Sequence, residues 1–329
     1  MSRSRIIGTG TYLPARKVTN DDLVKEFGID TSDAWIRERT GIGARRMAAT
    51  GEATSDMATA AARKALEMAK ISPEELDMIV IGTVTPDMQF PSAAVLVQAN
   101  LGAKRAACFD VSAACAGSIY AISIADSFIR SGNMKKVLVI GAELLTRISD
   151  WKDRATCVLF GDAAGAMVLV PETREDRGIL STHLYSDGTQ ANILNIPGGG
   201  SRKPFGPDVW EKREHLVKMN GREVYKTAVR VLETASREAL QQNGYEPKDV
   251  DYVIAHQANL RILDAVMKRL EIPLEKCEVN IDEVGNTSSA SVPLTLDQAN
   301  RAGKLKDGDL ILMMAIGGGM AWGSALMRW

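Results

Sequence analysis

Residues 65–82, ALEMAKISPEELDMIVIG, align without a gap to residues 239–256, ALQQNGYEPKDVDYVIAH. An Ala-Leu pair, a proline and the aspartate before the last apolar run coincide in the two segments. Each segment has the pattern of a helix end, a turn with proline and a buried strand rich in β-branched residues. The chain therefore contains an internal repeat built from α/β units.

Further matches follow in the same order. One shares Asp, Arg and Gly at the same steps, the next is a pair of apolar strands, and the last shares a Gly-x-Ala-x-Gly spacing. The matched segments are DSFIRSGNM (126–134) with DQANRAGKL (297–305), KKVLVIGAE (135–143) with DLILMMAIG (309–317), and GDAAGAMVLV (161–170) with GMAWGSALMR (319–328). We therefore predict two copies of one unit, residues 1–172 and 173–329, joined through a shared core.

The strands of the repeat are continuous apolar runs rather than alternating ones, which is typical of strands buried on both faces. Amphipathic helices between the strands would cover those faces. We therefore expect two mixed sheets that enclose helices in a pseudo-twofold arrangement. Ligands of such sheets usually bind beyond the carboxyl ends of the strands.

Composition narrows the class of protein. A 329-residue chain with 45% hydrophobic and 25% charged residues is typical of a globular protein, and a net charge of -1 argues against a nucleic-acid binder. The four cysteines lack the spacing of a zinc or redox motif, so we expect reduced thiols and no metal. The segment MSRSRIIGTGTYLP (1–14) lacks the apolar core that a signal peptide would have, and the sequence contains no apolar run of transmembrane length. We therefore expect a cytoplasmic protein without a membrane partner.

Cys115 is the first candidate for chemistry, in the segment AACFDVSAACAGSIYAISIADSFIRSG (106–132). CFDV predicts a strand, and the apolar spacing from Ala116 predicts a buried helix. A thiol at a helix N-terminus lies near unpaired amide donors and the positive end of the dipole, which favour thiolate. The alternative is a buried core thiol. The other cysteines, predicted to lie on strands, keep that interpretation: Cys108, Cys157 and Cys277.

His256 is the second candidate, at the end of the strand DYVIAHQAN (251–259). The repeat places it at the carboxyl end of its strand, opposite Gly82. The other histidines are His183, predicted in a strand that runs into a turn, and His215, in a charged stretch. A lone histidine is more often structural than catalytic, and that alternative stays open.

Asn286 is the third candidate, in the loop DEVGNTSSASVPLTLDQA (282–299) before a predicted helix. In the register that aligns 126–134 with 297–305, it falls opposite Cys115. An asparagine followed by Thr-Ser-Ser is also a capping device, so a structural role is the alternative. The three candidates converge, because each lies at a strand end in repeat-related units.

The fourth feature is the run Gly317–Gly319 in AIGGGMAWG (315–323). Glycines allow the backbone to approach a ligand and to aim an amide hydrogen at it. The run lacks the lysine and spacing of a phosphate loop, and an apparent strand follows it rather than a helix.

At these residues the sequence resembles the β-ketoacyl-[acyl-carrier-protein] synthase III family of the thiolase superfamily. The resemblance is carried by IIGTGTYLP (6–14), TSDAWIRERTGI (31–42), FPSAA (90–94), DVSAACAGSIYA (110–121), FGDAAGA (160–166), AHQANLRI (255–262), GNTSSASVP (285–293) and GGGMAWGSALMRW (317–329). It departs from the family pattern at Ala255, where the family has proline. It implies a five-layered αβαβα thiolase fold, a homodimer and the first condensation of type II fatty-acid synthesis.

The resemblance assigns a catalytic triad of Cys115, His256 and Asn286. Cys115 would take an acyl group from a short acyl-CoA, and the amides of Cys115 and Gly318 would form the oxyanion hole. His256 and Asn286 would then stabilise the enolate formed when malonyl-acyl carrier protein loses carbon dioxide. The scheme needs no metal or redox cofactor, and CoA enters only as the thioester substrate.

The resemblance also implies binding residues. Trp35 and Arg154 would sandwich adenine, although core packing is an alternative for Trp35. The remaining CoA residues would be Thr31, Arg39, Gly221, Tyr225, Ala258 and Asn259. The acyl pocket would contain Phe160, Leu194, Val217, Ile316 and, from the dimer partner, Phe90, whose bulk favours an acetyl primer. A basic surface for the acidic carrier protein would contain Lys226, Arg261, Lys268 and Arg269, although helix solubility explains such charges equally well.

Several alternatives differ in chemistry. A starter-unit ketosynthase or acyltransferase of secondary metabolism would share the Cys-His-Asn triad. A degradative thiolase would need a second cysteine near the C-terminus, and an elongating synthase would need a second histidine in place of Asn286. A non-catalytic binding module would not be acylated at Cys115.

Overall fold

The computed structural model describes residues 3–329 and contains a five-stranded sheet in the first half of the chain. The strand order is β1-β7-β6-β4-β5, in which β4 is parallel to β5 and β6, and β7 is antiparallel to β1 and β6. The strands are β1 (Arg3–Tyr12), β4 (Met78–Gly82), β5 (Ala107–Val111), β6 (Val137–Glu143) and β7 (Ala163–Glu172). Every residue of β4 and β6 is buried, as their continuous apolar runs predict.

A four-stranded sheet in the second half repeats this pattern. Its order is β11-β12-β13-β8, with β11 and β12 parallel and the other pairs antiparallel. The strands are β8 (Gly178–Ser186), β11 (Tyr252–Ala255), β12 (Leu310–Gly317) and β13 (Ala321–Arg328). They match β1, β4, β6 and β7 in turn, and the place of β5 is taken by a single parallel bridge between Val253 and Cys277.

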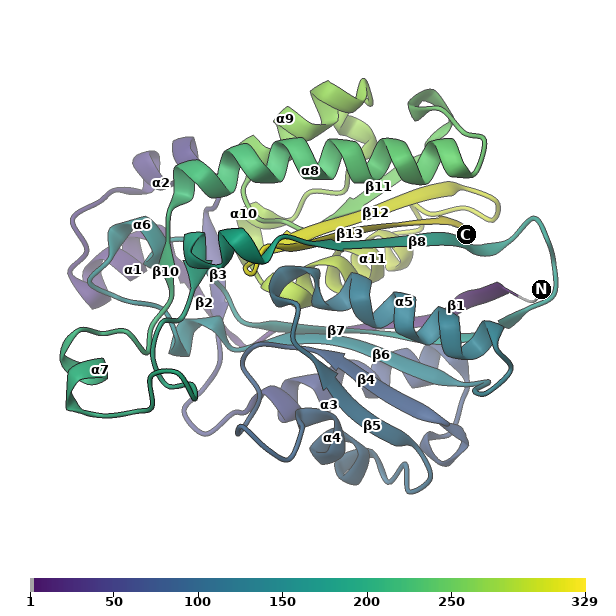
Figure 1. The fold of residues 1–329 in the computed structure, drawn as a ribbon, viewed down its shortest axis with the longest axis horizontal. Coiled ribbons are helices and arrows are strands. Elements are labelled where there is room, and N and C mark those ends of the chain that lie inside the picture. Colours follow the sequence, from purple (N-terminus) through teal and green to yellow (C-terminus); the bar gives the residue numbers. More distant parts are fainter. Residues whose placement is uncertain (1–2) are drawn as a thin grey trace.

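Helices form three layers around and between the two sheets (Figure 1). The outer face of the first sheet is covered by α3 (Thr54–Ala69) and α4 (Ala93–Leu101), and that of the second by α8 (Gly221–Gln242) and α9 (Leu260–Leu270). Between the sheets lie α5 (Gly117–Arg130) and α11 (Ser291–Arg301). The layers therefore follow the predicted order αβαβα. None of the helices in residues 3–329 has both the length and the apolar character that a bilayer crossing needs.

The aspartate and arginine shared by the matched segments have a structural role in α5 and α11. Arg130 pairs with Asp126, which also accepts a hydrogen bond from Ser4 Oγ at 2.6 Å. Asp297 pairs with Arg301 in the same way and accepts a hydrogen bond from Thr9 Oγ1 of β1 at 2.7 Å. Both central helices are thus tied to β1 through a buried carboxylate.

Two turns before these helices have the same conformation. The 3-10 turn η2 (Ala114–Ala116) precedes α5 and η7 (Ser288–Ala290) precedes α11, and each begins at a positive φ, 45° at Ala114 and 49° at Ser288. The alignment of 65–82 with 239–256, when it is continued along the chain, also superimposes these two turns. In this alignment Cys115 corresponds to Ser289. The prediction that Asn286 lies opposite Cys115 is therefore wrong. The register used for that prediction holds only at the helix ends, because α5 has 14 residues and α11 has 11.

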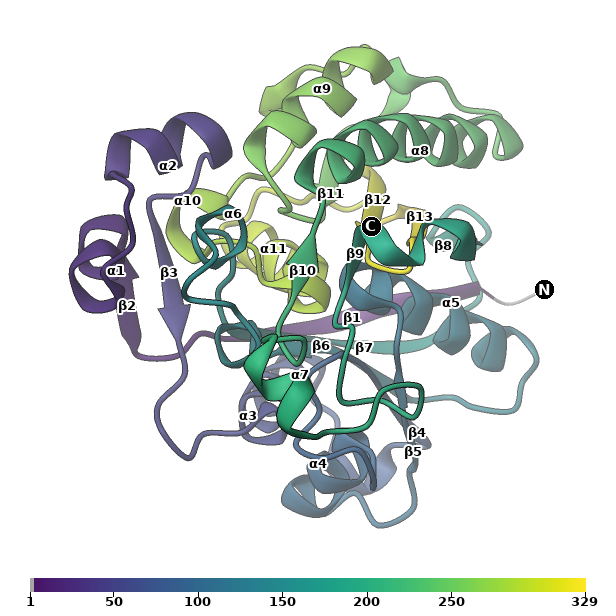
Figure 2. The same ribbon diagram turned by 60° about the vertical axis from the view of Figure 1, so that its left-hand side comes forward.

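The chain leaves the two sheets in segments that gather at one end of the molecule (Figure 2). The first contains β2 (Arg16–Thr19), α1 (Asn20–Phe27), α2 (Asp33–Thr40) and β3 (Ala44–Met47). The others contain α6 (Arg154–Cys157), then β9 (Leu194–Asn195), α7 (Pro207–Glu211) and β10 (Lys218–Met219), and last α10 (Ile281–Val284).

The strand predictions for two of the cysteines are wrong. Cys157 lies in α6, where the side chain of Asp153 caps the helix, and Cys277 forms only the single bridge.

Candidate active site

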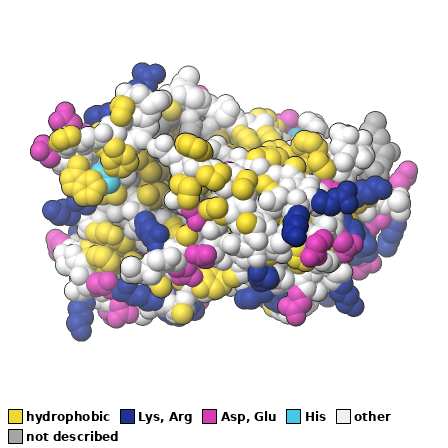
Figure 3. Space-filling model, turned by 90° about the horizontal axis from the view of Figure 1, so that it is seen from below, with side chains coloured by type: hydrophobic (Ala, Val, Ile, Leu, Met, Phe, Trp, Pro, Cys, Tyr) yellow, Lys and Arg dark blue, Asp and Glu magenta, His cyan; other side chains and the backbone are white. Residues whose placement is uncertain are grey.

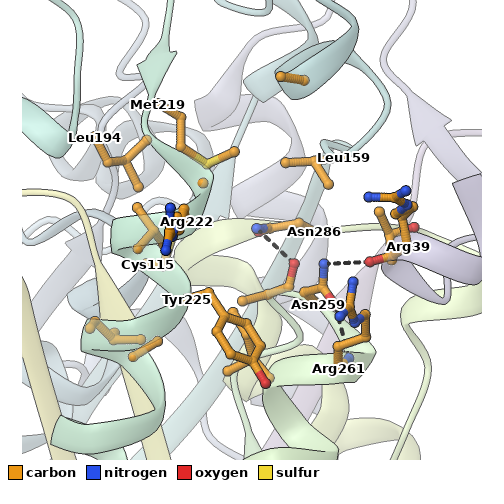
Figure 4. Close-up of a pocket in the computed structure, with 18 of the residues that line it drawn as sticks. Arg39, Cys115, Leu159, Leu194, Met219, Arg222, Tyr225, Asn259, Arg261 and Asn286 are labelled. Carbon is orange, nitrogen blue, oxygen red and sulfur yellow. Dashed lines mark hydrogen bonds between the residues drawn. The ribbon is translucent and has the colours of Figure 1, made fainter.

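A cavity of about 740 Å³ opens between the two halves, next to the ends of β11 and β12 (Figure 4). Cys115, His256 and Asn286 all line it. The cysteine comes from the first half of the chain and the other two come from the second. The structure therefore brings the predicted triad to one site.

Cys115 lies in the turn that opens α5, with 8% of its surface exposed. The turn is pressed against the end of β12, where a Cβ at Gly317 would lie 2.3 Å from the Cys115 backbone nitrogen. Only glycine fits there. Burial raises the pKa of the Cys115 thiol to about 12, and the charge of Glu143 acts in the same direction. The expectation that the helix N-terminus makes Cys115 a thiolate is therefore not met in this structure. The effect of burial, which raises the pKa of the thiol, is larger than that of the hydrogen-bond donors, which lower it.

His256 follows β11 directly, and its backbone N–H donates to Met314 O at 2.8 Å. The side chain is buried, and its Nδ1 has no hydrogen-bond partner within residues 3–329. Burial lowers the pKa of His256 to about 3. The imidazole is therefore neutral at physiological pH, with one N–H to donate.

Asn286 is held by backbone pairing with the first half of the chain. Its N–H donates to Leu159 O, and its carbonyl accepts from Gly161 N–H, both at 2.9 Å. The side-chain Oδ1 accepts from Ser288 N–H at 2.9 Å, so the Nδ2 group remains as the donor, with a weak contact to Ala258 O at 3.5 Å. This orientation presents an amide donor to the cavity.

Most of the predicted CoA residues lie on the cavity wall, namely Trp35, Arg39, Gly221, Tyr225, Ala258 and Asn259. Arg154 and Thr31 do not line it. Arg154 Cζ lies 4.9 Å from the Trp35 ring centroid, and its Nη1 donates to Asp30 O at 2.8 Å. An aromatic ring between Trp35 and Arg154 would need two contacts of about 3.5 Å, so the space predicted to hold adenine is closed in this structure.

The predicted acyl pocket is only partly assembled. Phe160, Leu194 and Ile316 line the cavity, whereas Val217 is buried behind it in the same apolar cluster as Phe160. Phe90 is 84% exposed. The sequence analysis missed other apolar lining residues, which have no motif of their own: Val158, Leu159, Met219 and Met320.

The predicted basic surface divides into two groups. Lys226 and Arg261 line the cavity, and so does Arg222, which the sequence analysis missed. Lys268 pairs with Asp264 and Arg269 pairs with Glu233, and neither lines the cavity. Gly318 is also absent from the cavity wall, and a Cβ there would lie 2.7 Å from Leu194 O.

No group of three or more metal-ligating side chains occurs within residues 3–329. The other two histidines lie apart from the cavity. His183 is in β8, hydrogen-bonded to Ser181 Oγ at 2.9 Å, and His215 stacks on Trp210 at 4.5 Å between ring centroids. The four cysteines are free.

A five-layered fold with a cysteine, a histidine and an asparagine at the junction of its halves defines the condensing enzymes of the thiolase superfamily. Two family models match, 3-oxoacyl-[acyl-carrier-protein] synthase III at residues 109–188 and its C-terminal model at residues 240–329. The chain belongs to this family, as predicted.

Individual comparisons agree with that assignment. The chain is 51% identical over 324 residues to the β-ketoacyl-[acyl-carrier-protein] synthase III of Caldanaerobacter subterraneus subsp. tengcongensis. The aligned region covers 98% of this chain and 97% of the relative. A solved 3-oxoacyl-[acyl-carrier-protein] synthase III from Aquifex aeolicus is 50% identical with a TM-score of 0.92, covering 99% and 100% of the two chains. The priming β-ketosynthase of the R1128 polyketide pathway is similar at 37% identity and a TM-score of 0.91, covering 99% and 96%.

Proposed function

We propose that this protein transfers a short acyl group from acyl-CoA to Cys115 and condenses it with malonyl-acyl carrier protein, initiating type II fatty-acid synthesis. The observation that carries the proposal is the convergence of Cys115, His256 and Asn286 on one cavity. The similar proteins that carry the synthase III name support the same reaction. The proposed steps use no metal or redox cofactor.

In the first step Cys115 attacks the thioester carbonyl, CoA leaves as its thiolate, and the acyl group stays on sulfur. The carbonyl oxygen becomes an oxyanion, which we assign to the backbone amides of Cys115 and Gly318. The close contact between Gly317 and the Cys115 backbone supports this assignment, because it holds the turn and the glycine run together.

In the second step the malonyl group loses carbon dioxide and leaves an enolate. Neutral His256 and the Nδ2 group of Asn286 would donate hydrogen bonds to its oxygen. The carbanion then attacks the acyl carbon, which releases the Cys115 sulfur and gives a 3-ketoacyl-acyl carrier protein. The side-chain orientation of Asn286 supports its role as donor.

CoA binding requires one rearrangement. Arg154 must leave the face of Trp35 before adenine stacks between them, and the exposed position of Arg154 allows this. For the acidic carrier protein, Arg261 and Lys226 remain the proposed contacts, because they lie at the cavity. Lys268 and Arg269 do not line the cavity. Their charges are paired with carboxylates, as is that of Lys226, whereas Arg261 has no ion pair within the described residues.

A homodimer is the proposed assembly, and the cytoplasm is the proposed location. β5 lies at the edge of its sheet, and exposed hydrophobic side chains occur next to it at Met88, Phe90 and Val95. Figure 3, viewed from the side of α4 and β5, shows hydrophobic side chains gathered on this face. A partner here would cover Phe90 and bring it to the partner's acyl pocket, where its bulk would favour acetyl over longer primers.

The test is acyl labelling followed by condensation. Acetyl-CoA should add one acetyl group to Cys115, seen by mass spectrometry of the intact chain and its peptides, and Cys115→Ser should abolish the label. Cys108→Ser is the matched control and should keep it. Addition of malonyl-acyl carrier protein should then release 3-ketobutyryl-acyl carrier protein, and labelling without this product would reject the condensation.

The similarity to a priming β-ketosynthase supports a second candidate function, that of a starter-unit ketosynthase. A primer scan with acetyl, isobutyryl, octanoyl and longer CoA thioesters separates the two functions. Preference for acetyl supports fatty-acid initiation, whereas preference for a branched or longer primer supports a starter-unit ketosynthase.

A further inference from the structure

A carboxyl group that the proposed mechanism does not use is buried behind the nucleophile. Glu143, the last residue of β6, has no exposed surface. Thr85 Oγ1 donates to its Oε2 at 2.6 Å, and Val84 N–H approaches both oxygens at 3.2 and 3.3 Å. Ser289 Oγ and Ser288 Oγ lie 2.9 and 3.1 Å from its Oε1. No cation is among these contacts, so the group is a buried carboxyl without a counter-charge on it.

The geometry allows the carboxyl to hold a proton that reaches it. Ser289 Oγ also lies 2.6 Å from Gly82 O, which only accepts, and a hydroxyl has one proton to donate. If that proton goes to Gly82, the contact with Glu143 is a hydrogen bond only when Glu143 donates it. Burial raises the pKa of Glu143, which acts in the same direction.

The Ser288 hydroxyl connects Glu143 to the nucleophile. Its Oγ lies 3.1 Å from Glu143 Oε1, and a hydrogen bond between Ser288 and the Cys115 sulfur lowers the pKa of that thiol. As a carboxylate, Glu143 also raises the pKa of the Cys115 thiol through its charge. The packing of η7 against β6 and against η2 keeps this path short, since a Cβ at Gly141 would lie 2.0 Å from Ser289 O.

We propose that Glu143 accepts the proton of the Cys115 thiol through Ser288 and returns it when the acyl group leaves. This inference rests on the proposed role of Cys115 as nucleophile. Glu143 touches neither substrate nor the reacting carbon, so it is a positioning residue that stores a proton. It supplies the acceptor that His256 does not supply, because burial depresses the pKa of that imidazole.

The proton balance closes over one turnover. The step starts from a Cys115 thiol and a Glu143 carboxylate. The Cys115 proton moves to Ser288 Oγ as the Ser288 proton moves to Glu143 Oε1, leaving a thiolate beside a neutral carboxyl. The thiolate forms the acyl thioester, and CoA leaves as its thiolate and takes a proton from solvent. When the carbanion attacks, the C–S bond breaks, and the freed sulfur regains its proton from Glu143 through Ser288.

The surroundings of Glu143 add no competing titratable group to this pair. The 83–85 segment presents Thr83, Thr85 and the Val84 amide, and η7 presents two serine hydroxyls. On the side of β7, Glu143 pairs with Ala163. Within the described residues, the titratable partner connected to this carboxyl is therefore the Cys115 thiol.

The experiment measures alkylation of Cys115 by iodoacetamide against pH, with the modified peptide quantified by mass spectrometry. The assay needs neither acyl-CoA nor carrier protein, so it is independent of the labelling test of function. In the wild type the thiol proton has an internal acceptor, so the rate should level off by about pH 8. In Glu143→Gln the proton must leave to solvent, and the rate should keep rising about tenfold per pH unit between about pH 8 and pH 10.

Two neighbouring serines give a matched pair of controls. Ser288→Ala removes the relay and should behave like Glu143→Gln, whereas Ser289→Ala, which touches the same carboxyl oxygen, should level off as the wild type does. Glu143→Asp should restore levelling in part. If Glu143→Gln does not fold, the serine pair decides in its place. Levelling at the same pH in the wild type and in the folded relay variant would overturn the proposal, and so would a wild-type rate that does not level off.

Discussion

The neutral state of His256 has a consequence for stability that can be measured. Burial lowers its pKa from 6.5 to about 3 in the folded protein, so the unfolded chain takes up a proton below pH 6.5 and the folded chain does not. Stability contributed by the neutral imidazole is therefore present above pH 6.5 and is lost as pH falls. The loss is about 1.4 kcal/mol per pH unit, or about 2 kcal/mol between pH 8 and pH 5.

The perturbation is His256→Asn, which removes the titrating group and keeps a polar side chain. The assay is urea unfolding of both proteins at pH 8 and pH 5, at one protein concentration. At pH 8, the difference in the free energy of unfolding between wild type and variant measures the packing that the substitution removes. On going to pH 5, the free energy of unfolding of the wild type should fall by about 2 kcal/mol more than that of the variant. Equal losses in the two proteins would refute the conclusion that His256 is buried in its neutral form.

Three further predictions concern the site. Gly317→Ala should cost about 1–3 kcal/mol in the free energy of unfolding and reduce acylation, because its Cβ meets the nucleophile's backbone, whereas Gly188→Ala has open space and should be neutral in urea unfolding. Asn286→Ala should still acylate Cys115 but condense about 10²–10³-fold more slowly, and loss of radiolabel transfer would contradict this division of roles. Arg261→Glu should raise KM for malonyl-acyl carrier protein about tenfold or more at low salt, while Lys268→Glu should not; equal effects would reject a docking role for Arg261.

Much of the fold was predictable because the repeat encodes it. The matched apolar strands defined which segments form the sheets, and buried strands require helices on both faces. Cys115 and His256 were found because strand ends are where such folds bind ligands. The equivalence of Cys115 and Asn286 was wrong, because α11 is shorter than α5 and the register between the halves shifts, and no sequence pattern shows where that shift occurs.

The remaining features depend on side-chain positions that only the tertiary structure defines. The closure of Arg154 over Trp35 depends on the rotamer of a long exposed chain. Whether Lys268 is free or paired depends on Asp264 one helical turn away. Glu143 was missed because a lone glutamate after an apolar strand has no motif, and its partners, Thr85 and Ser288, come from segments far from it in the sequence.

The matched turns also explain why the halves are not interchangeable. In the register of the turns, Cys115 corresponds to Ser289 and Glu143 to Gly317, and the contacts cross between halves: Glu143 meets Ser289, and Gly317 meets Cys115. A chimera made of two copies of the first half would place a glutamate where Gly317 lies, with its Cβ 2.3 Å from the backbone of the nucleophile turn. The difference between the two halves at these positions is thus a steric requirement of the packing around the nucleophile.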